Sequence, residues 1–164
     1  MIDRQTFRDA MARLGAAVNV ITTTGADGPR GFTASAVCSV TDDPPTLLLC
    51  LNRGSDNHDP LKANGILCVN TLAASQEALS PMFAGFTNVQ QAERFEQVEW
   101  TTLETGSPVL KDAVVSFDCR IENVVEVGTH TVFFCQVQAI QTGLSHDGLI
   151  YFGRTYHQIK VVAA

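Results

Sequence analysis

The sequence lacks the features that mark membrane, secreted and nucleic-acid-binding proteins. Its longest apolar runs, TLLLCL and TVFFC, are far shorter than the roughly 20 residues that cross a bilayer, and its opening segment is too charged for a signal peptide. The 164 residues include 11 basic and 17 acidic side chains, for a formal net charge of -6, without any basic run. We therefore expect a cytoplasmic protein that has no membrane or nucleic-acid partner.

Cysteine and histidine are few and irregularly spaced. The five cysteines form no C-x-x-C pair, and four of them lie in apolar runs typical of strands, so we expect reduced, buried thiols. The histidines at positions 58, 130, 146 and 157 do not combine with cysteines or carboxylates at metal-ligand intervals. No metal site is predicted, and His58, which precedes Asp59, is interpreted as part of a solvated loop.

Common catalytic and nucleotide-binding motifs are also missing. The sequence contains no G-x-G-x-x-G, G-x-x-x-x-G-K, G-x-S-x-G or H-E-x-x-H pattern. This excludes nucleotide binding through the usual loops that open a helix.

Strand-like patterns dominate what is present. The turn signals GADGP and GTH each lie between two β-branched or alternating segments, which is typical of hairpins. We predict strands over residues 16–25, 30–37, 45–52, 65–72, 113–127 and 131–143, and one or two more within 148–162. With no alternation of strands and helices, the pattern predicts a mainly β fold, an antiparallel barrel with peripheral short helices in a single domain over residues 1–164.

Three short helices are expected beside these strands. The first begins at a capping box of Thr6 and Asp9 and ends at Gly15. The second has Asp59 as N-cap and ends before Gly65. The third lies within residues 75–86, and the segment after it, up to Trp100, is predicted to be a loop.

The segment from Thr33 to Asp42 consists almost entirely of small or hydroxylated residues, although apolar segments flank it. Small side chains leave backbone amides accessible and allow a flat ring to lie against the strand, and the hydroxyl groups add donors for an anion. An alternative is a tightly packed barrel strand that contacts another subunit. Further along, Asn52, Arg53 and Ser55 follow an apolar strand, and an arginine there is suited to a phosphate group.

The chain resembles the short-chain flavin reductases, the small components of two-component flavin-dependent monooxygenases. The resemblance extends in order over nearly the whole chain, through GFTASAVCSVTDDPPTLLLCLNRGS, LCVNTL, FAG, GTH and GLIYFGRTYH. It is greatest to the reductase partners of pyrimidine (uracil) monooxygenase and of 4-hydroxyphenylacetate 3-monooxygenase. It implies a flavin-binding split β-barrel, antiparallel and Greek-key-like, which assembles as a homodimer.

The resemblance also implies where the flavin binds. The small-residue segment is expected to lie along the ring, and the residues after residue 51 are expected near the ribityl and phosphate groups. His130, in the Gly-x-His turn, is expected beside the nicotinamide as the catalytic residue. The implied cofactor-binding residues are Thr33, Ala34, Ser35, Ala36, Val37, Cys38, Ser39, Asn52, Arg53, Ser55, Asn57, Phe83, Ala84, Arg154 and Tyr156.

The implied reaction is hydride transfer from NADH or NADPH to FMN or FAD, after which the reduced flavin diffuses to a partner monooxygenase. Such a transfer needs two stacked rings and no protein nucleophile, which agrees with the missing triads. The segment GSDNHDPLKANG varies within the family and leaves FMN and FAD both open, whereas the lack of an additional basic cluster favours NADH. Two alternatives remain: a barrel with permanently bound FMN that acts like an oxidase, and a flavin-binding barrel without catalysis.

Overall fold

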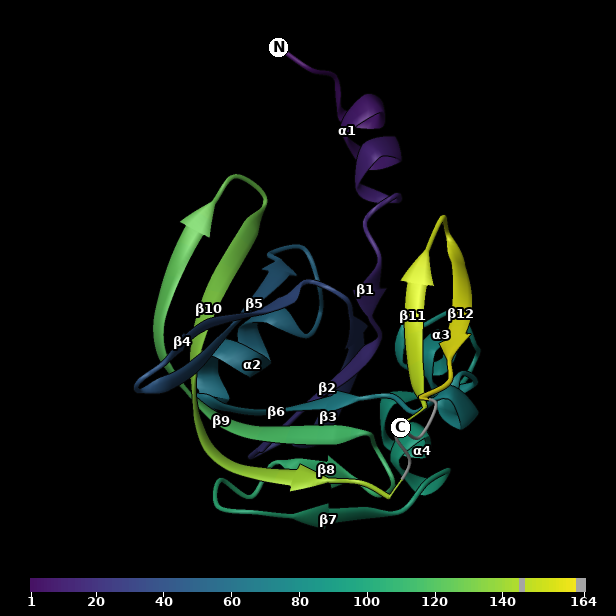
Figure 1. The fold of residues 1–164 in the computed structure, drawn as a ribbon. Helices are drawn as coiled ribbons and strands as arrows, with labels where there is room; N and C mark the ends of the chain where they lie inside the picture. Colours follow the sequence, from purple (N-terminus) through teal and green to yellow (C-terminus); the bar gives the residue numbers. More distant parts are fainter. Residues whose placement is uncertain (145–146, 162–164) are drawn as a thin grey trace.

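The computed structural model describes residues 1–144 and 147–161, so His146 and the end of the predicted tail strands lie outside the described residues. An antiparallel main sheet forms the centre of the fold (Figure 1). Its strand order is β3 (Gly28–Ala34), β2 (Asn19–Gly25), β6 (Ile66–Thr71), β9 (Val115–Val127), β10 (His130–Thr142), β5 (Pro45–Asn52) and β4 (Val37–Asp42). The predicted antiparallel β architecture is confirmed.

Two smaller sheets and several short helices surround the main sheet. The first small sheet comprises β1 (Ala16–Ala17), β11 (Gly148–Phe152) and β12 (Thr155–Ile159), and the second comprises β7 (Trp100–Thr102) and β8 (Pro108–Leu110). The helices are α1 (Arg4–Met11), α2 (His58–Asn64), α3 (Leu79–Phe83) and α4 (Gln91–Glu96), with a 3-10 turn, η1, at Ala74–Gln76.

The predicted hairpins form where glycine permits a left-handed turn. Gly28 has a φ of 83° at the β2–β3 turn, and Gly128 has a φ of 56° between β9 and β10. The pairing of β9 with β10 shifts register after Phe134 and again after Val137. Such bulges increase the bend of a strand, and both long strands curve strongly in Figure 1, which lets the sheet curl around a core.

The core of the curled sheet is built from alternate residues of its strands. Ile21, Leu49, Leu67 and Phe133 come from four different strands and are at most 1% exposed. Each such side chain contributes about 1.5–3 kcal/mol of burial free energy. A second cluster, which includes Leu72, Phe83, Leu110 and Leu149, lies between the main sheet and the smaller elements.

The cysteines match their prediction only in part. Cys68, Cys119 and Cys135 are buried, and burial raises the pKa of the Cys135 thiol to about 12, so these thiols are unreactive. Cys50 is half-buried, and Cys38 is exposed, which corrects the expectation that it is buried. Cys38 lies on β4, an edge strand whose residues are all exposed after Val37.

The helix boundaries correct three expectations. The N-cap of α1 is Asp3, whose carboxylate accepts hydrogen bonds from the amides of Gln5 and Thr6, so the predicted capping box at Thr6 is wrong. Helix α2 begins at His58 rather than after Asp59, although Gly65 ends it in the left-handed conformation as expected. The predicted loop before Trp100 contains α4.

Candidate functional site

The small-residue segment, Thr33–Asp42, includes the end of β3, the two residues that follow it and all of β4, and these are the two outermost strands of the main sheet. Strands β3 and β4 are consecutive in the chain, yet they lie at opposite ends of the strand order, so the barrel is split between them. Ala36 lies between β3 and β4 in the chain, and its carbonyl accepts a hydrogen bond from the amide of Cys50 on β5 at 3.0 Å. The segment from Thr33 to Cys38 therefore borders the opening of the barrel.

Three adjoining cavities are each lined in part by residues of this segment. The first, of about 240 Å³, shares Thr33 and Ala84 with the second, of about 590 Å³, and shares Ser35 with the third, of about 990 Å³. The second and third volumes fall in the range of small-molecule sites, and the first lies below it. Thirteen predicted cofactor-binding residues line them: Thr33, Ala34, Ser35, Ala36, Val37, Cys38, Asn52, Ser55, Asn57, Phe83, Ala84, Arg154 and Tyr156.

The first cavity has neutral walls with a small polar group at one side. The Thr33 hydroxyl donates to the carbonyl of Ser80 at 2.7 Å, and the Ser80 hydroxyl lies 2.9 Å from the Tyr156 hydroxyl. Tyr156 also packs against Tyr151, with ring centroids 5.2 Å apart. These contacts fix the ring of Tyr156 beside a mostly apolar space that lies next to exposed backbone.

The second cavity lies between β3, the loop after β5, and α4. In the loop, the Asn52 carboxamide accepts from the amide of Gly54 at 2.8 Å, which fixes the turn that carries Ser55. Gln91 of α4 donates to the side chain of Asn57 at 2.9 Å and forms hydrogen bonds with both backbone polar groups of Gly31. Gln91 thus holds three elements around one cavity.

The third cavity lies between α1 and the small-residue segment. Arg154, at the β11–β12 turn, forms an ion pair with Asp9 of α1. This hydrogen bond to Arg154 lowers the pKa of Asp9 from its usual value. The ion pair connects α1 to the rest of the chain.

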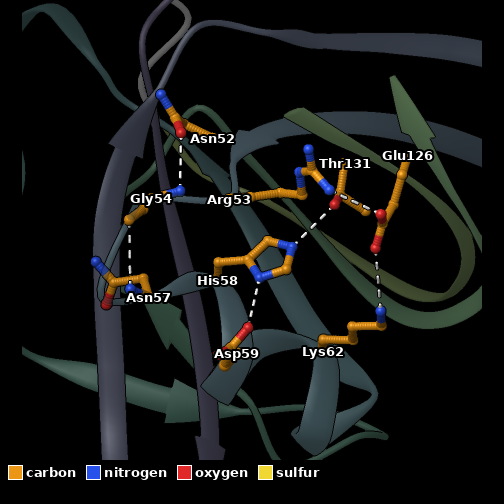
Figure 2. Close-up of polar contacts among 10 residues, drawn as sticks. Asn52, Arg53, Gly54, Asn57, His58, Asp59, Lys62, Glu126 and Thr131 are labelled. Atoms are coloured by element: carbon orange, nitrogen blue, oxygen red, sulfur yellow. Dashed lines mark hydrogen bonds and ion pairs between the residues drawn. The ribbon is translucent and has the colours of Figure 1, made fainter. Parts of the chain in front are cut away.

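Arg53 does not reach these cavities. Its guanidinium contacts Glu126 at 2.8 Å (Figure 2). The guanidinium also donates to the carbonyl of Gly128, and the amide of Arg53 donates to the carbonyl of Thr129 at 2.9 Å. Lys62 of α2 also approaches Glu126, at 3.8 Å. Arg53 therefore connects the loop after β5 to the β9–β10 turn.

His130 and Ser39 also lie outside the three cavities. His130 is exposed at the start of β10, directly opposite Asn52 of β5, and its Nδ1 lies 2.9 Å from the Thr129 hydroxyl. Since Asn52 lines the second cavity, His130 lies next to a wall of that cavity. Ser39 is exposed on β4.

His58 is buried, which corrects its interpretation as a solvated residue. Only 5% of it is exposed, its Nε2 lies 2.9 Å from the Thr131 hydroxyl, and its Nδ1 lies 2.7 Å from the Asp59 carboxylate (Figure 2). Its amide also donates to the carbonyl of Ser55 at 2.9 Å. The residue therefore anchors the loop that lines the second cavity.

Comparison with known proteins agrees with this geometry. The family model of the flavin reductase like domain matches residues 11–160. The chain belongs to the flavin reductase like domain family. It is 58% identical over 158 residues to the FMN reductase (NADH) RutF of Ancylobacter novellus, covering 96% of this chain and 86% of that protein.

Solved flavin reductases share the fold. The flavin reductase PheA2 superposes with a TM-score of 0.88 at 31% identity, covering 98% of this chain and all of that chain. The styrene monooxygenase flavin reductase SMOB from Pseudomonas putida S12 superposes with a TM-score of 0.84 at 28% identity, covering 96% and 99% of the two chains. The expected split β-barrel is thereby confirmed.

Sequence reasoning missed several cavity-lining residues of this flavin reductase family member. Arg30, Gln91 and Arg94 line the second cavity, and Ser80 lines the first. Gln91 and Arg94 come from α4, a short helix without a full apolar stripe, so periodicity could not place them, whereas Ser80 lies in the predicted third helix as a polar residue among its apolar ones. Arg30 lies on β3 with Thr33 but an odd number of residues away, so strand alternation gave no reason to place both at one cavity.

Within residues 1–144 and 147–161, no group of three or more histidine, cysteine or acidic side chains could hold a metal ion. Among the same residues, no helix has the length and apolar character needed to span a bilayer.

Proposed function

We propose that this protein is an NADH-dependent FMN reductase that supplies reduced flavin to a partner monooxygenase. The observation that supports this most directly is that the part of the small-residue segment from Thr33 to Cys38 borders three adjoining cavities. The name of the 58% identical relative, FMN reductase (NADH), supports both the flavin and the donor. SMOB is the flavin reductase of a styrene monooxygenase, which supports the proposed partner class.

The cavity walls fit a flavin in two parts. In the first cavity, Ala34, Ser35 and Ala84 leave room for a planar ring, and no charged residue of the described chain lines it. In the second cavity, Ser55 and Asn57 supply polar groups suited to the ribityl chain and the phosphate. When bound, FMN supplies the ring that accepts the hydride of NADH.

The chain itself orients the two reactants. Hydride transfer needs the donor and acceptor atoms about 3–3.5 Å apart, and rigid walls such as the Tyr156–Ser80–Thr33 contacts favour a single ring position. We assign His130 a role beside the nicotinamide on the basis of the family's Gly-x-His turn; in the structure it lies opposite Asn52, which lines the second cavity. The variant His130→Ala is expected to slow flavin reduction more than it weakens flavin binding.

We further propose a homodimer, in which a second copy covers α1. No residue of α1 is buried, and Phe7 and Leu14 are 59% and 62% exposed on one face of this N-terminal segment. An isolated helix of eight residues is marginal in water, so its apolar face favours a protein surface against it. A cytoplasmic location agrees with three buried reduced thiols and with NADH as donor.

Steady-state assays separate this proposal from its alternatives. Purified protein with NADH and excess FMN is expected to consume NADH, at a higher kcat/KM than with FAD or NADPH. Dialysis is expected to remove the flavin, whereas a permanently bound FMN would remain. Failure to oxidise NADH in the presence of FMN would favour a carrier without catalysis and would contradict the proposal.

A further inference from the structure

We propose that Arg30 and Arg94 bind the 5′-phosphate of the flavin, and that Arg53, which the sequence assigned to this task, is a positioning residue for the β9–β10 turn. The inference rests on the proposed function, since it concerns the same flavin. It differs from the expectation drawn from the sequence in the residues that carry it and in the helix that supplies one of them.

Arg30 and Arg94 line the same cavity from opposite elements. Arg30 lies on β3 and Arg94 on α4, and the loop that carries Ser55 and Asn57 lines the same cavity. Both arginines are half-buried. A phosphate in this cavity would therefore have two guanidinium groups and neutral polar groups in its lining.

Both guanidinium groups have donors to spare. Arg94 donates through Nε to the carbonyl of Val89 at 3.0 Å, and within residues 1–144 and 147–161 its terminal nitrogens form no hydrogen bond or ion pair. Arg30 forms neither kind of contact through its side chain with any described residue. An arginine with two free nitrogens can bind phosphate oxygens through two parallel hydrogen bonds.

The charges lining the cavities favour the second cavity for the anion. Asp56 is the acidic residue among its described lining residues, against Arg30 and Arg94. A phosphate monoester carries about -1.5 to -2 charges at neutral pH, which the net positive charge of this lining offsets in part. The first cavity, which shares Thr33 and Ala84 with it, has a neutral lining suited to the ring.

Arg53 is already neutralised by its neighbours. Its contact with Glu126 (Figure 2) and its hydrogen bonds to Gly128 and Thr129 lie at or beside the turn before His130. To bind a phosphate it would have to give up the Glu126 carboxylate. Its contacts instead fix where the β9–β10 turn lies relative to the loop after β5.

Binding of FMN and of riboflavin, which lacks the phosphate, tests the assignment. We expect Arg94→Gln and Arg30→Gln each to weaken FMN binding by about tenfold or more, as measured by flavin fluorescence and calorimetric titration. Riboflavin binding should change less than about twofold in both variants. Arg94→Lys, which keeps the charge without the planar fork, should lie between wild type and Arg94→Gln.

Two further variants are matched controls for the loss of one positive charge. Arg120→Gln removes an exposed charge on β9, outside the three cavities, and should leave FMN binding unchanged. Arg53→Gln should affect FMN and riboflavin equally and should raise the KM for NADH, because it loosens the turn that carries His130. Thermal unfolding of each variant identifies any general loss of stability.

Three binding results and one kinetic result would overturn the inference. The binding results are equal weakening of FMN and riboflavin by Arg94→Gln and Arg30→Gln, unchanged FMN binding in both variants, or a selective loss of FMN over riboflavin in Arg53→Gln. A rise in the KM for NADH alone would assign the two arginines to the dinucleotide and would also overturn it. If the wild type binds FMN but does not oxidise NADH, the proposed function fails while the binding comparison still decides the role of the arginines.

Discussion

Arginine side chains lie in two neighbouring regions of this molecule, and they have different hydrogen-bond partners in each. Around the second cavity, the side chains of Arg30 and Arg94 have donors to spare and face an open space. At the adjoining ends of β5 and β10, Arg53 and its neighbours use their polar groups on one another. The same residue types can thus form a binding site or a structural connection, and the difference lies in the available partners.

The difference shows why a residue type at a strand end is weak evidence for a binding role. An arginine beside a carboxylate at 2.8 Å and a carbonyl has little reason to leave them for a ligand. An arginine without such neighbours stays hydrated and exchanges water for a phosphate more readily. Four changes, ordered by expected effect, test the cavities and the connected region at the ends of β5 and β10.

The variant Ser35→Leu should have the largest effect, on binding. Ser35 is exposed and lines both the first and third cavities, so a branched side chain would occupy the space proposed for the ring. We expect FMN affinity to fall about 100-fold, measured by fluorescence titration, with the melting temperature unchanged. Thr41→Leu adds a branched chain to β4 outside these cavities and should bind FMN normally; unchanged affinity in Ser35→Leu would count against the proposed site.

The variant Gly31→Ala should destabilise the wall of the second cavity. A Cβ at this position would lie 2.8 Å from the Phe83 ring, and Phe83 is 1% exposed with little freedom to move. We expect the free energy of unfolding to fall by about 1–3 kcal/mol in chemical denaturation. Gly148→Ala is the matched control, because a Cβ there meets nothing within 4 Å; equal losses in the two variants would contradict the packing argument.

The variant His58→Ala should weaken the connected region at the ends of β5 and β10. It removes a buried ring and leaves the Thr131 hydroxyl, which is 0% exposed, without its partner. We expect a loss of about 2 kcal/mol in unfolding free energy, and about 1 kcal/mol for Thr131→Val. The double variant should cost less than the sum of the two; strict additivity would show that the hydrogen bond contributes nothing.

The sequence predicted the framework well because alternating apolar residues and turn glycines are local signals. The β2–β3 and β9–β10 hairpins follow from such patterns, and so does the small-residue segment at the opening of the barrel. Long-range pairing is different. Nothing local reveals that Arg53 meets Glu126, 73 residues away, or that His58 meets Thr131.

The missed helix α4 shows the same limit. It has six residues, too few for a periodic stripe, and its position depends on Gln91 bonding to Gly31 and Asn57. Because these contacts are tertiary, the residues that α4 adds to the second cavity were not predictable from the sequence. The candidate site was therefore predicted on the β3–β4 side and missed on the α4 side.

The smallest effect is expected from Asp9→Asn at the third cavity. Arg154 holds the pKa of Asp9 below its usual value, so the ion pair stabilises α1 above a pH of about 4 and its contribution is lost as the pH falls through the lower folded pKa. Amide hydrogen exchange in α1 of the wild type should therefore accelerate below that pH relative to intrinsic rates. Asp9→Asn should exchange faster at neutral pH and lose this acid dependence; an acid transition that persists in the variant would assign it to another carboxylate, with Asp3, the N-cap of α1, as the alternative.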